Sequence, residues 1–146
     1  MFRGNHPTRV DEKGRLKLPA DFRNELEGGG EGKQVFYITS KDGERAELWP
    51  IKAWEEIEAT LATIPSTNPA KRKFLDVTNY YGAMAEMDTQ GRLLLPQILR
   101  DKASLTADVV VYGAQKYLEV LNRPTVEAQP QKLTAEDMAG LSELGI

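Results

Sequence analysis

The chain has 146 residues, a formal net charge of −3, no cysteine and a single histidine. These counts exclude disulfides, thiol nucleophiles and histidine clusters. Because few of the residues that form common catalytic sites are present, we expect a non-enzymatic protein without a cofactor or a bound metal. Bulk charge alone also argues against electrostatic binding to nucleic acid. Because no apolar run resembles an export signal or a membrane span, the expected location is the cytoplasm, with no membrane partner.

The first predicted elements are a strand, a helix and a hairpin. Residues 15–18 alternate in polarity, which predicts a strand with its two leucines on one face. Gly14 precedes it at a turn that needs a positive φ, and Pro19 ends the strand and opens a helix. A hairpin is predicted next, with strands over 35–39 and 46–49 around an Asp-Gly turn.

Two helices are predicted in the middle of the chain, and a short one near its end. Apolar residues at helical spacing mark the first: Trp54, Ile57, Leu61 and Ile64. Asn68 is expected to cap the second, with Pro69 in its first position, and Gly82 to end it. In the last segment, residues 134–137 resemble a capping box, which predicts a terminal helix.

An internal repeat divides the chain. Residues 11–26 (DEKGRLKLPADFRNEL) match residues 88–103 (DTQGRLLLPQILRDKA) at seven of sixteen positions. Weaker similarity continues into a second predicted hairpin, so each copy is a unit of about fifty residues. We expect the following organisation: a first unit over 5–52, linking helices over 53–80, a second unit over 81–124, and an acidic tail over 125–146.

The repeated motif Asp-x-x-x-Arg carries a family resemblance. It occurs at Asp11–Arg15 and again at Asp88–Arg92, each time before a Leu-x-Leu-Pro run. The motif resembles the core of AbrB/SpoVT swapped-hairpin barrels, and two tandem copies resemble the bacterial MraZ family over residues 1–126. The resemblance implies a mainly β fold with flanking helices (α+β), in which the two tandem units form one pseudo-twofold β-barrel. Four residues of the two motifs are expected to have a structural role. Gly14 and Gly91 are expected to occupy the turns, and Asp11 and Asp88 to accept hydrogen bonds from N–H groups of the turns or to hold an arginine.

The resemblance also implies a function. MraZ-like proteins are transcriptional regulators that bind repeated elements in the promoter of the division and cell-wall gene cluster, including that of their own gene. They form ring-like homo-oligomers whose N-terminal β faces line the DNA. The implied partners are therefore double-stranded promoter DNA and further copies of this chain, and the implied location is the nucleoid within the cytoplasm.

A comparison of the two copies predicts which half touches DNA. Three cations of the first unit have no basic counterpart in the second: Arg9 corresponds to Glu86, Lys13 to Gln90 and Lys17 to Leu94. We expect the first unit to carry the main DNA face and the second mainly to complete the barrel. The candidate DNA-binding residues are Arg3, Arg9, Lys13, Arg15, Lys17 and Arg92. Arg15 is the expected base-edge contact, since arginine pairs bidentately with guanine, and the lysines and Arg9 are expected to contact phosphates.

Some alternatives stay open at this point. The basic residues at odd positions project together if one strand stays extended, but Gly14 can break that register. Arg23 and Arg100 fit fold support and DNA contact equally. The run Lys71-Arg72-Lys73 fits a solvated helix face or salt bridges between subunits. A second functional class is a protein–protein assembly or antitoxin-like swapped-hairpin module without specific DNA binding.

Overall fold

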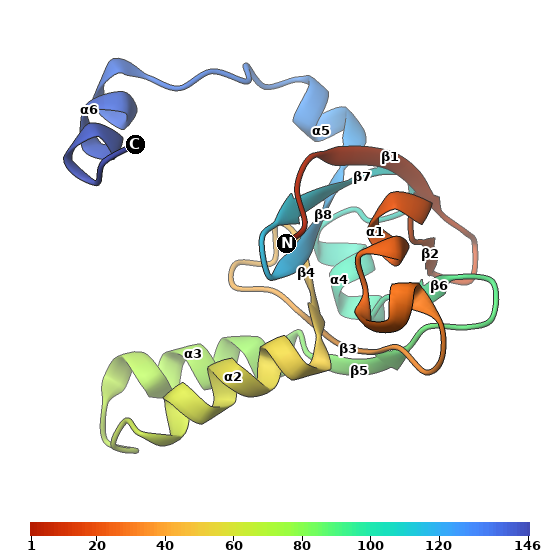
Figure 1. The fold of residues 1–146 in the computed structure, drawn as a ribbon, viewed down its shortest axis with the longest axis horizontal. Helices are drawn as coiled ribbons and strands as arrows, with labels where there is room; N and C mark the ends of the chain where they lie inside the picture. Colours follow the sequence, from red (N-terminus) through yellow and green to blue (C-terminus); the bar gives the residue numbers. More distant parts are fainter.

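The computed structural model describes all residues, Met1–Ile146, and its centre is a single antiparallel sheet. Its eight strands are β1 (Asn5–Val10), β2 (Arg15–Lys17), β3 (Val35–Thr39), β4 (Ala46–Pro50), β5 (Ala83–Glu86), β6 (Arg92–Leu94), β7 (Ala107–Ala114) and β8 (Tyr117–Asn122). They follow the order β5-β3-β4-β8-β7-β1-β2-β6. The sheet curls into a nearly closed barrel with helices around it, which confirms the expected mainly β fold with flanking helices (Figure 1).

The two repeated units interleave at the pair formed by β2 and β6. In this antiparallel pair Leu16 lies opposite Leu93, and both side chains are fully buried. Two reciprocal backbone hydrogen bonds of 2.9 Å flank the pair: the Leu18 N–H donates to the Gly91 carbonyl, and the Leu95 N–H donates to the Gly14 carbonyl. Exchanging the units leaves this pattern unchanged, so an approximate twofold axis passes between β2 and β6.

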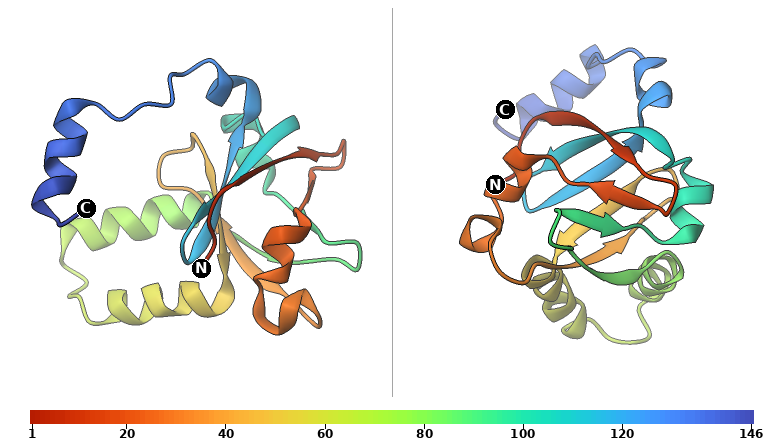
Figure 2. Two further views of the ribbon diagram at one scale, coloured as in Figure 1. Left: turned by 45° about the horizontal axis from the view of Figure 1, so that its top comes forward. Right: turned by 90° about the vertical axis from the view of Figure 1, so that its right-hand side faces the viewer.

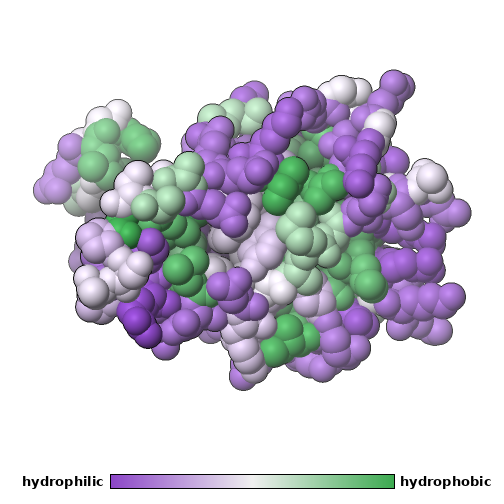
Figure 3. All heavy atoms as spheres, turned by 90° about the horizontal axis from the view of Figure 1, so that it is seen from below, coloured by the Kyte–Doolittle hydropathy of each residue, from purple (hydrophilic) through white to green (hydrophobic).

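The barrel has one seam. β1 is joined to β2 by pairing of Val10 with Leu16, but no ladder joins the corresponding strands β5 and β6. An open pocket of about 380 Å³ lies there, and the exposed side chains of Met84 and Leu94 line it. From below, the molecule shows apolar patches among hydrophilic atoms (Figure 3).

The core fills the barrel and depends on the alternation within the strands. One cluster of buried apolar side chains runs through it, with contributions from both units. Its largest fully buried members are Phe36, Leu16, Leu18, Ile38, Leu48, Leu93, Leu95, Leu99, Leu105 and Leu118. Two short helices close the barrel ends, α1 (Ala20–Asn24) through Phe22 and α4 (Gln97–Lys102) through Leu99; a 3-10 turn, η1 (Glu27–Gly30), follows α1. Since each unit alone would leave its apolar face open, the two must fold together.

The remaining helices leave the barrel. α2 (Ile51–Ala62) and α3 (Pro69–Tyr80) form a projecting hairpin, and Asn68 caps α3 by accepting from the Lys71 N–H at 3.1 Å, as predicted. Trp54 anchors α2 through stacking on Tyr37 at 4.7 Å between ring centroids. The predicted terminal helix is present as α6 (Ala135–Glu143). Figure 2 shows α6 held away from the barrel by an extended segment.

Candidate nucleic-acid interface

The first Asp-x-x-x-Arg motif builds a tight turn between β1 and β2. The Asp11 Oδ1 atom accepts hydrogen bonds from the backbone N–H groups of Lys13 (3.0 Å) and Arg15 (2.9 Å). Its Oδ2 atom accepts from the Arg15 Nε at 2.8 Å. Gly14 has φ +84°, a left-handed conformation that favours glycine. The turn interrupts the chain between β1 and β2, so the basic residues do not lie on one extended strand. This confirms the alternative in which Gly14 breaks the register.

The second motif repeats this geometry. The Asp88 Oδ1 atom accepts from the backbone N–H groups of Gln90 and Arg92, each at 2.9 Å, and the Oδ2 atom accepts from the Arg92 Nε at 2.8 Å. Gly91 has φ +74°. In both turns the carboxylate fixes the backbone and one edge of the guanidinium. Because only Nε is engaged by the aspartate, the two terminal nitrogens of each arginine stay free to donate elsewhere.

These contacts favour the ionised carboxylates. The pKa of Asp11 lies below its usual range, mainly because the Arg15 backbone N–H donates to the charged form, with a further contribution from the Arg15 guanidinium. At Asp88, desolvation raises the pKa, but the hydrogen bonds from the Arg92 backbone and side chain together outweigh it, and the net pKa is again lowered. Both turns are therefore in their charged, hydrogen-bonded form at neutral pH.

Strand alternation turns the charged residues of β2 and β6 outward. Leu16 and Leu93 point into the core, so their neighbours lie on the opposite face. On that face Arg15 is opposite Leu94, and Lys17 is opposite Arg92. The outer surface of this two-stranded ribbon thus carries three cations and one exposed leucine. A ribbon of two strands has the width that the major groove of B-DNA admits.

The cations of both units surround one open pocket of about 650 Å³. Five basic and two acidic side chains line it: Arg9, Arg15, Lys17, Arg92 and Arg100, with Asp11 and Glu12. The pocket is locally positive on a chain whose net charge is −3. Residues that are 77 positions apart in sequence thus lie on one composite surface, which we call the basic face.

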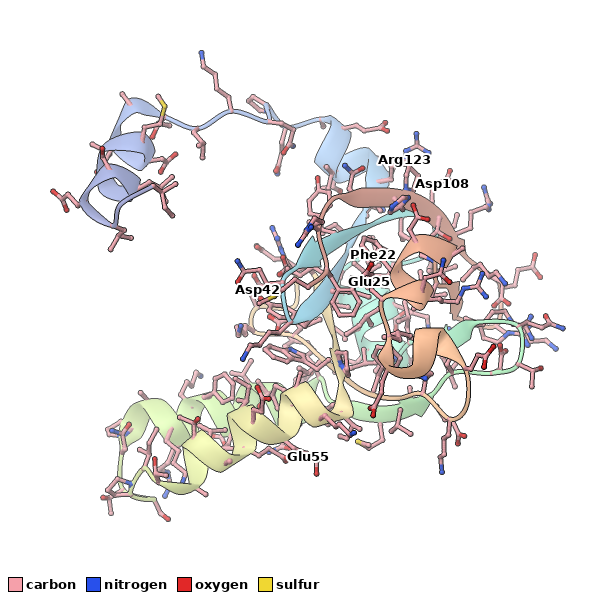
Figure 4. The ribbon with its side chains drawn as sticks, viewed as in Figure 1. Phe22, Glu25, Asp42, Glu55, Asp108 and Arg123 are labelled. Carbon is pink, nitrogen blue, oxygen red and sulfur yellow. The ribbon has the colours of Figure 1, made fainter.

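Some cations of the basic face are held by neighbouring polar groups. The Arg9 Nη1 atom lies 2.8 Å from a carboxylate oxygen of Asp108, at the start of β7. Figure 4 shows Asp108 at the end of the barrel where Arg123 also lies. The Lys17 Nζ donates to the backbone carbonyl of Gln90, in the turn of the other unit. These contacts position the two side chains, although Arg9 remains 70% exposed.

Two of the predicted DNA-binding residues lie outside the pocket. Lys13 is exposed in the turn beside it. Arg3 is exposed near the start of the chain, where its backbone lies against Gly113 on β7. The structure therefore groups Arg9, Arg15, Lys17 and Arg92, and does not bring Arg3 into that group.

Arg23 and Arg100 pack reciprocally across the twofold axis. A methyl group added at Gly14 would overlap the Arg100 guanidinium, and one added at Gly91 would lie 2.7 Å from the Arg23 Nη1. Arg100 also donates to the Leu95 carbonyl at 3.1 Å, while the Arg23 Nε is buried without a partner. Both arginines thus cover the turn glycines of the opposite unit, and Arg100 in addition lines the basic face.

Sequence reasoning missed some of these features. Nothing in the sequence pairs Arg9 with Asp108, because 99 positions separate them. The helix α5 (Arg123–Glu127) was also missed, although its signal was present: Asn122 accepts from the Thr125 N–H, and Pro124 follows, much as Asn68 and Pro69 open α3.

The fold and the basic face together define a class, the tandem swapped-hairpin barrel in which one chain supplies both halves. A family model described as "MraZ protein, putative antitoxin-like" matches residues 1–77 and 83–143. The chain belongs to the MraZ family. It is 59% identical to "Transcriptional regulator MraZ" of Acidobacterium capsulatum and 50% identical to the protein of that name from Koribacter versatilis, over the whole of each chain.

More distant relatives carry the same name. The protein from Thiobacillus denitrificans is 37% identical over 99% of this chain and 97% of its own. The name denotes a regulator and no enzymatic activity. In the structure, no helix is long and apolar enough to cross a membrane.

Proposed function

We propose that this chain is a sequence-specific DNA-binding regulator of transcription that binds double-stranded DNA through the basic face. One observation carries the proposal: Arg9, Arg15, Lys17, Arg92 and Arg100, from both units, surround a single open pocket beside the β2–β6 ribbon. Such a concentration of cations attracts an anionic partner, and the terminal nitrogens of Arg15 and Arg92 are free to bind one. The names of the relatives point to the same role for their own chains.

The geometry suggests a division of labour within the basic face. Asp11 holds Arg15 by its Nε and leaves the terminal nitrogens to pair with the major-groove edge of guanine. Lys17, Lys13 and Arg9 surround this position and would contact phosphates, which fix the register of the duplex. Arg3 would extend the phosphate contacts only if the duplex continues over β1.

The biological target follows from family resemblance. The proposed sites are repeated elements in the promoter of the division and cell-wall gene cluster, including the promoter of this chain's own gene. The chain would act there as a ring-like homo-oligomer, in the cytoplasm and on the nucleoid. Several copies of the basic face on one assembly would then bind neighbouring repeats at once, which would raise the overall affinity for the DNA through avidity.

A gel-shift competition tests the proposal. The probe is the duplex upstream of the gene, and the competitors are the same duplex unlabelled and a scrambled duplex of equal length. We expect the unlabelled probe to compete at concentrations at least tenfold lower than the scrambled duplex. Equal competition, or no retention at any salt concentration, would favour the alternative function, an assembly or antitoxin-like module that does not bind specific DNA.

The asymmetry between the units gives a second test. Arg15→Ala is expected to weaken binding by about 1–3 kcal/mol, roughly tenfold to a hundredfold, because it removes a base contact. Arg92→Ala should have a smaller effect, since the second unit has Glu86 and Leu94 at the positions that correspond to the cations Arg9 and Lys17 of the first. Lys132→Ala, which removes an equal charge from the tail, is the control. Equal losses from Arg15→Ala and Arg92→Ala would contradict a main DNA face in the first unit.

A further inference from the structure

The tip of the α2–α3 hairpin carries an unpaired basic cluster. α3 carries Lys71, Arg72 and Lys73 in succession from its third residue and has no acidic residue in its first turn. The amino end of a helix already carries a partial positive charge, so cations at this end destabilise it unless an anion is close. The Lys71 Nζ donates a hydrogen bond to the Ile64 carbonyl at 2.7 Å, whereas Arg72 and Lys73 are exposed and form no ion pair.

α6 is complementary to this cluster. It contains Glu136, Asp137 and Glu143, with no cation between residues 133 and 146. Its own capping box, in which the Thr134 hydroxyl and the Asp137 carboxylate exchange hydrogen bonds with backbone N–H groups, holds it as a helix without tertiary support. Glu136 and Glu143 have no partner. The exposed apolar side chains alongside them include Met138, which is 54% exposed, and Leu144, which is 78% exposed.

The two features project from the same side of the barrel. In Figure 1 both α6 and the α2–α3 hairpin extend away from the side that carries β2 and β6. They do not meet within one chain, because Figure 2, right, places them at opposite ends of the molecule, and no hydrogen bond or ion pair joins them. Each chain thus presents one acidic, partly apolar helix and one basic helix end, each without a partner.

We propose that α6 of one copy docks on the first turn of α3 of a neighbouring copy, with Glu136 and Glu143 against Arg72 and Lys73. The contact joins two different surfaces, so it is head-to-tail, and repetition produces a closed ring or a filament. The inference rests on the proposed self-association of the chain and supplies a surface for it. It also leaves the basic face, on the other side of the barrel, free for DNA.

The basic face is a weaker candidate for the same acidic helix. Three of its four arginines already have a carboxylate partner: Arg15 with Asp11, Arg92 with Asp88, and Arg9 with Asp108, all at 2.8 Å. A carboxylate added there would bind cations whose charge is already partly neutralised, whereas at the α3 end it would bind cations that have no carboxylate partner and would offset the helix dipole.

Charge reversal with rescue tests the contact. The solution mass of the full chain is measured by light scattering, without DNA, for Glu136→Lys/Glu143→Lys and for Arg72→Glu/Lys73→Glu. Asp137 and Lys71 are left intact because the Asp137 carboxylate caps α6 and the Lys71 ammonium binds the Ile64 carbonyl between α2 and α3. We expect each double variant to fall to a smaller species, and the variant that combines all four substitutions to regain the wild-type mass. Glu25→Lys/Glu31→Lys, at exposed barrel positions without side-chain partners, is the control and should keep the wild-type mass.

Three results would overturn the inference: wild-type mass in both double variants, a monomeric wild-type chain, or no rescue in the combined variant. A gel-shift with the same proteins separates this question from the proposed function. If wild-type chain assembles but retains no DNA, the proposed function fails and the inference stands. If Arg72→Glu/Lys73→Glu keeps the mass and loses DNA, the α3 end is a DNA contact and the inference is wrong.

Discussion

At the scale of single residues, the two Asp-x-x-x-Arg turns combine a structural and a functional task. Each aspartate binds two backbone N–H groups and one arginine Nε, and each turn glycine provides a left-handed residue over which an arginine of the other unit lies. One turn therefore fixes the hairpin, orients an arginine toward solvent and contacts the opposite half of the barrel.

Gly14→Ala should be clearly more destabilising than the same change at Gly28. Both residues have positive φ, +84° and +69°, but only at Gly14 would the added methyl group overlap a side chain, the Arg100 guanidinium. We expect a loss of about 1–3 kcal/mol at Gly14, where moving the Arg100 guanidinium also breaks its hydrogen bond to the Leu95 carbonyl, and about 1 kcal/mol at Gly28, where only backbone strain applies. Urea unfolding measures both. Similar losses would show that Arg100 yields without cost.

The lowered pKa values of Asp11 and Asp88 predict a dependence of stability on pH. A carboxyl group with a lower pKa in the folded state stabilises fully above its unfolded pKa, about 4, and this stabilisation is lost as the pH falls through the folded pKa. The urea concentration at half unfolding should therefore decrease when the pH is lowered below about 4. The double variant Asp11→Asn/Asp88→Asn should have a lower urea midpoint at pH 7 and a smaller decrease of that midpoint at acidic pH. Asp76→Asn, at an exposed position whose side chain makes no hydrogen bond, is the control and should keep the wild-type urea midpoint at pH 7.

At the scale of the elements, the barrel depends on the pairing of β2 with β6. Each strand has only three residues, and each places one leucine at the centre of the interface between units. Such short strands are not stable alone, so the order of the two units comes from their shared core rather than from local preference.

Leu16→Ala and Leu93→Ala should destabilise the chain to a similar degree. Both leucines are fully buried and lie opposite each other at the twofold axis, so each truncation leaves an equivalent cavity and costs about 2–5 kcal/mol. Leu94→Ala is the control, since that side chain is 56% exposed, and its effect should be below about 1 kcal/mol. Denaturant unfolding checks the three variants. A large difference between Leu16→Ala and Leu93→Ala would contradict the twofold description of the core.

The sequence predicted those elements whose signals are local. Period-two alternation placed β2, the Asp-Gly turn placed the hairpin of β3 and β4, and side-chain caps placed α3 and α6. The repeat predicted two equivalent units, and the family resemblance implied that these units form one twofold barrel. Long-range proximity was not predictable: only folding brings Asp108 to Arg9 and carries Arg100 over Gly14. The missing ladder between β5 and β6 was likewise not predicted, because it depends on how the two ends of the sheet approach each other in the folded barrel.

At the scale of the whole molecule, charge is distributed rather than uniform. A chain with net charge −3 concentrates five cations around one pocket and places acid on α2 and α6. The barrel thus separates the basic face from the projecting helices, and the two sides can serve different partners. Membership of the MraZ family agrees with this arrangement, since the relatives are named as transcriptional regulators.

The salt dependence of DNA affinity tests the central claim most directly. The dissociation constant for the upstream duplex is measured at salt concentrations from about 50 to about 300 mM, because phosphate contacts weaken over this range. We expect the logarithm of the association constant to fall with the logarithm of salt concentration with a slope of about −3 to −4 per chain, for phosphate contacts by Arg9, Lys13 and Lys17 and their neighbours. Arg15→Ala should bind more weakly at every salt concentration. An affinity of the wild-type chain that does not change with salt concentration, or an Arg15→Ala variant with unchanged affinity, would contradict the account.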